Sequence, residues 1–170
     1  IEKRKSVGEF LIGFALLFMG LEALKGGVPD FTLPQYSGVL EFIASLSGYG
    51  YLSILLFVLI GTILTVVVQS SSAMMAITLV MCAKGLIGFE VAAALVLGEN
   101  IGTTITANMA AMMANATAKR AARAHLMFNV IGVVWMLVLF YPFLYLISWI
   151  VEPDSGNGIH LSALSIPVAL

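Results

Sequence analysis

The chain runs from residue 51 to residue 83 without one charged side chain, and this stretch limits the possible folds more than any other feature. Its residues are almost all apolar apart from one polar cluster, Gln69-Ser70-Ser71-Ser72. As a single helix it would be about 50 Å long, whereas the hydrocarbon core of a bilayer is about 30 Å thick. Divided at the cluster, its arms average about 25 Å, which is marginal for two crossings. We therefore expect residues 51–83 to form a re-entrant helical hairpin, with its tip at the cluster and both ends at one membrane face.

The overall composition places the rest of the chain in the lipid bilayer as well. Of its 170 residues, 61% are hydrophobic and 10% are charged, whereas soluble domains carry roughly 25% charged residues. The net charge of -1 lacks the basic excess that binding to nucleic acid requires, so we expect no nucleic-acid partner. The single Cys82 cannot form an internal disulfide.

The remaining segments divide at clusters of glycine, proline and polar residues. One segment, 86–114, is interrupted by two glycines, an asparagine and two threonines between residues 98 and 104, which predicts a broken transmembrane helix. Because the chain begins without Met and ends in an apolar run, we interpret it as a fragment of a longer protein. The other expected segments are a transmembrane helix at 8–24, an outer loop with one surface helix at 25–50, a cytoplasmic turn at 117–123, a transmembrane helix at 124–151 and the start of another at 159–170.

Basic residues indicate the orientation, since Lys and Arg accumulate in cytoplasmic loops. A re-entrant hairpin divides them six to two, whereas a full crossing by residues 51–83 would divide them four to four. The six on one side are Lys3, Arg4, Lys5, Lys119, Arg120 and Arg123, and the two on the other are Lys25 and Lys84. We therefore place the N-terminus and residues 117–123 in the cytoplasm, with the hairpin entering from the outer face.

The polar cluster is a candidate binding site. An unpaired hydroxyl or amide in an apolar environment costs about 1 to 3 kcal/mol, so four in a row require partners. A single serine in a membrane helix usually bonds to its own backbone or allows close packing. A run of four at a hairpin tip instead favours an anion site, formed by the hydroxyls and by the N–H groups of a helix that starts near Ser72.

The second cluster, Asn100 with Thr103 and Thr104, predicts a complementary site. A broken helix would present free carbonyls near Gly98 to a cation and free N–H groups near Thr103 to an anion. The alternative is a glycine-rich segment kept for packing. Between residues 51 and 116 the one basic residue is Lys84, so a bound cation must compensate a bound anion. This favours cation-coupled transport over passive diffusion of the anion.

Three further polar residues have two interpretations each. Glu99 is an intramembrane acid that we expect to face a cation, a proton or a hydrogen-bonding partner on another helix; alternatively it is a protonated or externally paired residue at a helix end. His125 and Asn129 lie four residues apart and are expected to support helix packing near the interface. A membrane-embedded hydrolase would need a nucleophile activated by that histidine, and no glycine-serine-glycine turn is present, so we expect no enzyme.

The motifs at 69–72, 97–107 and 118–129, in this order and spacing, resemble the Na/Pi cotransporter (type II sodium-phosphate symporter) family. That family is built from two inverted repeats, each with a Gln-Ser-Ser-Ser motif and a Gly-x-Asn-Ile-Gly-Thr-Thr motif. This chain has one copy of each and looks like the C-terminal repeat of a bacterial member, so the resemblance implies that another repeat lies upstream. It also implies an all-α integral membrane fold, comprising one inverted-repeat half with a re-entrant hairpin and a broken helix.

The resemblance implies sodium-coupled symport of inorganic phosphate across a bacterial inner membrane by an elevator-like, multi-pass protein. Sodium would be the coupling ion, with no other metal or cofactor. Glu99 departs from the small residue that is more common at its position in the family. The alternative function is a non-transporting scaffold or regulatory module whose serines serve helix packing. The implied phosphate ligands are Gln69, Ser70, Ser71, Ser72, Asn100, Thr103 and Thr104, and the implied sodium ligands are Gln69, Ser71, Gly98, Glu99 and Asn100.

Overall fold

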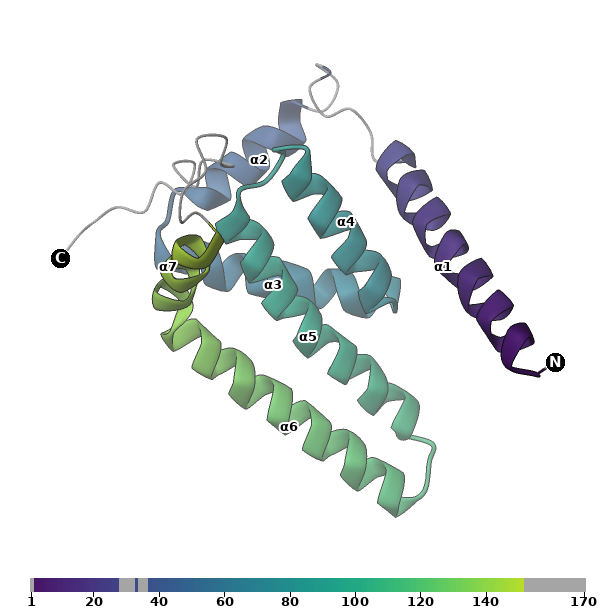
Figure 1. The fold of residues 1–170 in the computed structure, drawn as a ribbon. Helices are drawn as coiled ribbons and strands as arrows, with labels where there is room; N and C mark the ends of the chain where they lie inside the picture. The colour runs from purple at the N-terminus through teal and green to yellow at the C-terminus, as the bar shows by residue number, and fades with distance from the viewer. Residues whose placement is uncertain (1, 28–32, 34–36, 152–170) are drawn as a thin grey trace.

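The computed structural model describes residues 2–27, 33 and 37–151, and within them the chain is all helical (Figure 1). The expected all-α class is thereby confirmed for this part of the chain. The segment expected at 159–170 lies outside the described residues. The helices are α1 (Glu2–Gly27), α2 (Ser37–Ser47), α3 (Tyr51–Val68), α4 (Ser71–Ala83), α5 (Phe89–Ala111), α6 (Ala116–Val138) and α7 (Phe140–Val151).

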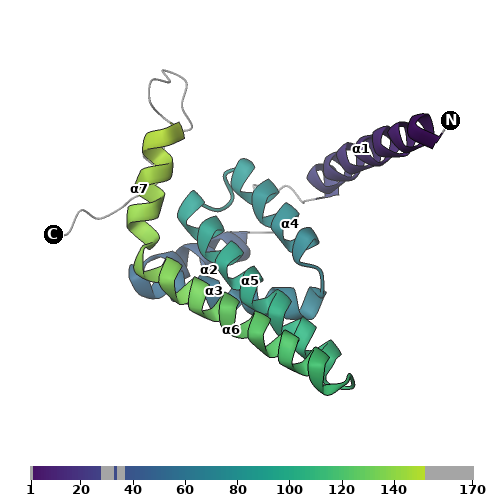
Figure 2. The same cartoon turned by 60° about the horizontal axis from the view of Figure 1, so that its bottom comes forward.

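Three of the described helices are long and apolar enough to cross a membrane, namely α1 over Lys5–Ala23, α3 and α6. The first coincides with the predicted helix at 8–24. It lies to one side of the bundle formed by α3 to α6 and contacts this bundle through α4 (Figures 1 and 2), and large apolar side chains such as Phe10 and Leu17 are exposed along it. Further along, α2 is the surface helix expected within 25–50. The apolar surface of α1 suits contact with lipid or with further membrane helices.

The break between α3 and α4 falls at the predicted polar cluster. Gln69 adopts a left-handed conformation with φ 57°, and its N–H donates to the Thr65 carbonyl at 2.8 Å. Ser70 then caps α4, because its Oγ accepts the N–H of Ala73 at 3.4 Å. The two arms diverge from this point as a V, and α5 packs against both of them (Figures 1 and 2).

The helices α3 and α5 are in backbone contact at three glycines. A Cβ atom on Gly61 of α3 would collide with the Leu95 carbonyl, and one on Gly98 of α5 would collide with the Val58 carbonyl. A Cβ on Gly102 would lie 2.7 Å from the Cβ of Thr65. Glycine at such positions lets helix backbones approach closely, which is how membrane helices gain van der Waals contact.

The predicted break within 98–104 is wrong, because α5 is a continuous helix from Phe89 to Ala111. Its polar side chains bond back to the helix itself. Thr103 Oγ1 donates to the Glu99 carbonyl at 2.8 Å, and Asn100 Nδ2 donates to the Val96 carbonyl at 3.1 Å. No free carbonyl is therefore present near Gly98, and no free N–H near Thr103. The glycines serve packing, as the alternative interpretation held.

The predicted turn at 117–123 is also wrong, because these residues form the first turns of α6. The chain turns at 112–115 instead, where Asn115 caps the helix by accepting the N–H of Ala118 at 2.9 Å. The helix expected at 124–151 is divided at Leu139 into α6 and α7. Pro142 explains this division, since its ring would collide with the Val138 carbonyl in an uninterrupted helix and it has no N–H to donate.

Replacing Gly98 by alanine is expected to destabilise the protein by about 3 kcal/mol, because the added methyl group must push α3 and α5 apart. Thermal unfolding of the purified protein in detergent, followed by circular dichroism, measures this effect. Gly132→Ala on α6 is the matched control, because a Cβ there meets no atom within 4 Å. Equal melting temperatures for the two variants would contradict the close contact.

Candidate substrate-binding site

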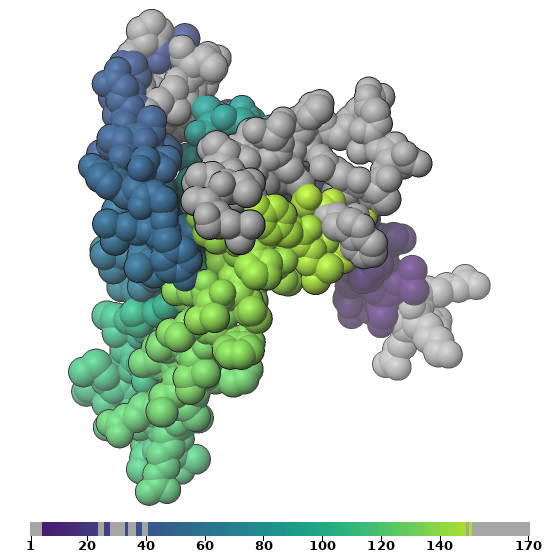
Figure 3. Space-filling model, turned by 90° about the vertical axis from the view of Figure 1, so that its left-hand side faces the viewer, coloured from purple at the N-terminus to yellow at the C-terminus, as the bar shows by residue number. Residues whose placement is uncertain are grey.

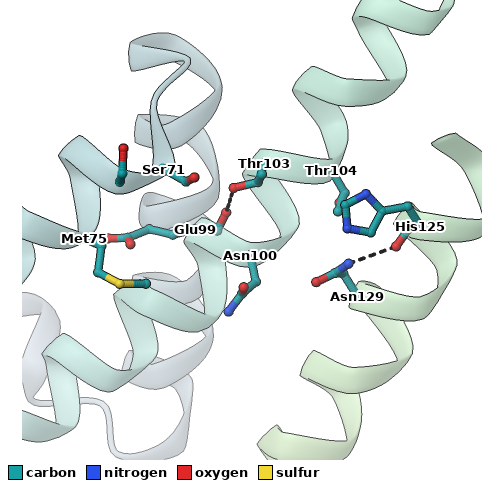
Figure 4. Close-up of a pocket in the computed structure, with 9 residues that line it drawn as sticks. Ser71, Met75, Glu99, Asn100, Thr103, Thr104, His125 and Asn129 are labelled. Carbon is teal, nitrogen blue, oxygen red and sulfur yellow. Dashed lines mark hydrogen bonds between the residues drawn. The ribbon is translucent and has the colours of Figure 1, made fainter. Parts of the chain in front are cut away.

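A pocket of about 310 Å³ opens between α4, α5 and α6 (Figure 4). Six of the residues around it were predicted from the sequence to bind phosphate or sodium. Three other predicted residues, Gln69, Ser70 and Gly98, do not line it. The lining residues are Ser71, Ser72, Met75, Glu99, Asn100, Thr103, Thr104, His125 and Asn129.

The α4 side of the pocket is the N-terminus of a helix. Ser71 and Ser72 are its first two residues, and the N–H groups of a helix's first turn have no acceptor within the helix. The Ser70 side chain accepts a hydrogen bond from the N–H of Ala73, and the Ser70 carbonyl accepts one from the N–H of Met74 at 3.1 Å. Within the described part of the chain, the N–H groups of Ser71 and Ser72 and the Ser71 hydroxyl therefore remain available, beside the positive end of the helix dipole, whereas the Ser72 hydroxyl lies 3.5 Å from Ser70 Oγ. This side of the pocket suits an anion.

Glu99 is a buried acid beneath the pocket. Its side chain is 1% exposed and extends toward Met75 and Ser71 of α4 (Figure 4). Thr78 of α4, itself buried, donates its hydroxyl to Glu99 Oε1 at 2.7 Å. Thr78 is thus a hydrogen-bonding partner on another helix, as one of the sequence interpretations expected. Glu99 Oε2 is also buried, and no residue in the described part of the chain gives it a hydrogen bond. A carboxylate oxygen in this environment needs a donor or a cation.

The α6 side of the pocket carries His125 and Asn129, which sequence reasoning assigned to helix packing near the interface. The structure instead places both at the pocket, across from Asn100 and Thr104 (Figure 4). The sequence alone does not show which face of α6 meets α5. Because α6 begins at Ala116, His125 lies about 14 Å along the helix and about 3 Å beyond Arg123. Their spacing of four residues puts them on one helix face, and this was the sequence feature that could have indicated a shared site.

Asn108 fixes α5 against α6 at one end of the pocket. Its Nδ2 group donates to the Thr104 carbonyl at 2.9 Å and, across the helix pair, to the Ala122 carbonyl at 2.8 Å. Both N–H bonds of this amide are therefore used structurally. Asn108 thereby holds the pocket residues of the two helices in register.

Replacing Thr78 by valine is expected to destabilise the protein by about 1 to 3 kcal/mol, because the shape is kept while Glu99 Oε1 loses its donor. Thr78→Ser, which retains the hydroxyl, should recover most of this loss. Thermal unfolding in detergent compares the two variants with the unmodified protein. A valine variant as stable as the serine variant would show that the hydrogen bond does not support the buried acid.

The profile of the Na+/Pi-cotransporter family matches residues 51–148, which contain α3 to α6 and every residue that lines the pocket. The chain belongs to this family. The resemblance inferred from the motifs is therefore confirmed. Since the family consists of transporters and is not enzymatic, the hydrolase alternative is eliminated.

Two of the three relatives compared with this family member have names that refer to phosphate transport. The chain is 44% identical over 110 residues to the uncharacterized protein YqeW of Bacillus subtilis, covering 62% of this chain and 34% of YqeW. It is 35% identical over 142 residues to the putative inorganic phosphate export protein YjbB of Escherichia coli K12, covering 84% of this chain and 24% of YjbB. It is 41% identical over 95 residues to the sodium-dependent phosphate transport protein 2C of Rattus norvegicus, covering 53% of this chain and 16% of that protein.

This Na+/Pi-cotransporter family member spans about a third or less of the length of these relatives. No solved structure matches it.

Proposed function

We propose that this chain forms one repeat, and so half, of a sodium-coupled inorganic phosphate symporter in a bacterial inner membrane. The observation that carries the proposal is the pocket itself. It joins a helix N-terminus with two serine hydroxyls, which suits an anion, to the buried carboxylate of Glu99, which suits a cation. The family membership and the names of the relatives support phosphate and sodium as the two ligands.

Phosphate would bind to the hydroxyls and N–H groups at the start of α4 and to the polar residues of α5. Ser71 and Ser72 contribute from α4, and Asn100 contributes its second side-chain N–H from α5. Thr103 and Thr104 donate their hydroxyls to carbonyls of α5 in this structure, so they would contribute by turning these hydroxyls toward the phosphate. Gln69 and Ser70 lie at the hairpin tip outside the pocket. In this proposal they complete the phosphate site from the tip, where the second repeat of the transporter meets the first.

Sodium would bind beside Glu99. The oxygen donors that line the pocket on this side are Glu99 Oε2, Ser71 Oγ and the side-chain oxygen of Asn100. In this proposal Gln69 would add its side-chain oxygen from the hairpin tip. Gly98 leaves the proposed set, because its carbonyl accepts the Thr62 hydroxyl at 3.0 Å and the residue packs against α3. A phosphate next to an uncompensated carboxylate would be repelled by roughly 4 kcal/mol per charge pair at 4 Å and an effective dielectric constant of 20. Sodium therefore binds first and makes phosphate binding favourable.

The membrane topology in this proposal follows from helix lengths. With 13 residues, α4 is about 20 Å long and too short to cross, which supports a re-entrant hairpin. With 23 residues, α5 is about 34 Å long, which is enough for one crossing, and we place it across the membrane although its most apolar stretch is less apolar than those of α1, α3 and α6. Lys84 precedes α5, while the basic residues at 119–123 follow it, so the two lie at opposite faces. The basic face, with the N-terminus, is cytoplasmic by the positive-inside rule.

Uptake of radiolabelled phosphate into liposomes tests this function. The complete protein is reconstituted, and an inward sodium gradient is compared with an equal potassium gradient. Accumulation with sodium alone supports the proposal, and equal uptake in both would eliminate sodium coupling. A scaffold without transport, in which the serines serve only helix packing, would show uptake in neither. The position of Ser71 and Ser72 at a pocket, and not in a helix contact, argues against that scaffold.

A further inference from the structure

We infer that His125 and Asn129 of α6 bind the transported anion directly, as the side of the site opposite the start of α4. The inference rests on the proposed function and extends it to a third helix. The hairpin and α5 then supply some of the residues that bind the anion, and α6 supplies the others.

The position of the two residues is the first support. Both line the pocket that contains Ser71, Ser72 and Thr104. In the close-up view, His125 and Asn129 lie on α6 across from Thr104 and Asn100, whereas Ser71 and Glu99 lie on the α4 side (Figure 4). An anion in this pocket therefore has α6 as its nearest surface on the side away from the hairpin.

The contrast with the apolar part of α6 that follows Arg123 is the second support. The neighbouring exposed side chains, among them Met127, Phe128 and Ile131, are large and apolar, and the helix runs along the surface of the molecule (Figure 3). His125 and Asn129 lie about 3 and 9 Å beyond Arg123 along the helix. An ionisable residue and an amide within an apolar stretch of a membrane helix need partners and mark candidate ligand sites. Here the polar face of α6 is turned to the pocket.

The unused hydrogen-bonding capacity is the third support. Asn129 uses one N–H for the His125 carbonyl at 3.0 Å within its own helix, which leaves its second N–H and its side-chain oxygen. Within residues 2–27, 33 and 37–151, no hydrogen bond or ion pair holds the imidazole of His125. An imidazole N–H and an amide N–H on one helix face are well suited to two oxygens of one tetrahedral oxyanion.

Phosphate binding by the complete protein tests the inference. Equilibrium dialysis with radiolabelled inorganic phosphate, in detergent and at saturating sodium, compares four variants with the unmodified protein. His125→Ala and Asn129→Asp should each weaken phosphate binding about 10-fold or more, since one loses a donor to a charged ligand and the other adds a repelling carboxylate. His125→Gln, which restores an N–H near the same place, should recover most of the affinity. Met127→Gln places an amide on α6 outside the pocket and should leave the affinity unchanged.

Uptake kinetics in liposomes provide the second readout. The phosphate KM should rise in His125→Ala while the sodium concentration for half-maximal uptake stays within about twofold, because only the anion contact is lost. Wild-type affinity in both His125→Ala and Asn129→Asp would overturn the inference even if transport is confirmed. Binding with the expected pattern but without transport would overturn the proposed function and leave the inference standing. Absence of phosphate binding by the unmodified protein would overturn both.

Discussion

Replacing Ser71 by alanine is expected to reduce phosphate transport by about 10- to 100-fold, since a hydrogen bond to a charged ligand contributes about 1.5 to 3 kcal/mol. Ser71 is the first residue of α4 and lines the pocket. The cap of α4 is its neighbour Ser70, so the substitution leaves the capping bond in place, and alanine is a good helix former. The loss should therefore appear in phosphate affinity and transport while the fold is retained.

Uptake into liposomes and phosphate binding in detergent measure this effect. Ser45→Ala is the matched control, because Ser45 lies on α2 and donates to the Phe42 carbonyl at 2.7 Å, away from the pocket. Ser70→Ala is informative as a third variant. It removes the cap and should cost about 1 kcal/mol of stability. Unchanged phosphate uptake in Ser71→Ala would remove the serine cluster from the site.

Replacing Glu99 by glutamine is expected to raise the sodium concentration for half-maximal uptake by at least about 10-fold. Glutamine has nearly the same shape, and its carbonyl oxygen still accepts the Thr78 hydroxyl, so the packing between α4 and α5 is kept. The negative charge is lost, and with it an attraction for sodium of roughly 4 kcal/mol at 4 Å and an effective dielectric constant of 20. Phosphate uptake should persist at high sodium, because the α4 side of the pocket is intact.

Glu90→Gln is the matched control for this variant. Glu90 lies in the first turn of α5 and accepts the hydroxyl of Tyr141 at 2.9 Å, far along the helix from the pocket. The sodium dependence of phosphate uptake by the Glu90→Gln variant should equal that of the unmodified protein. A sodium curve that is the same for Glu99→Gln and Glu90→Gln would exclude the Glu99 carboxylate as a sodium ligand.

Much of the fold follows from local sequence. The hairpin tip at Gln69 and Ser70 was predictable because a run of polar residues interrupts an otherwise apolar stretch, and serine is a favoured helix cap. The helix at α1 and the surface helix at α2 followed from apolar length and from flanking glycine and proline. In each case the deciding information lies within a few neighbouring residues.

Other features were decided by residues distant in sequence. Gly98 and Gly102 suit both an unwound segment and close helix packing, and the choice depends on Val58 and Thr65 of α3, which lie opposite them. The basic residues at 119–123 predict a turn when they are considered alone, whereas Asn115 caps a helix that contains them. Pro142 could have indicated the end of α6 at Val138 from local sequence alone.

The site was partly predictable for the same reasons. Six predicted residues from two motifs meet at one pocket, although the broken helix that was expected to unite them is absent. Met75, His125 and Asn129 were missed as lining residues, because the sequence does not say which face of α4 or α6 meets α5. That information resides in tertiary contacts such as the bond from Asn108 to the Ala122 carbonyl.

The coupling of the two fluxes tests the central claim most directly. The complete protein is placed in liposomes with equal sodium on both sides, an inward phosphate gradient is imposed, and uptake of radiolabelled sodium is followed. A symporter in which Glu99 binds sodium beside the phosphate site predicts that phosphate drives sodium inward, and that Glu99→Gln weakens this flux. Phosphate entry without any sodium movement would contradict the account.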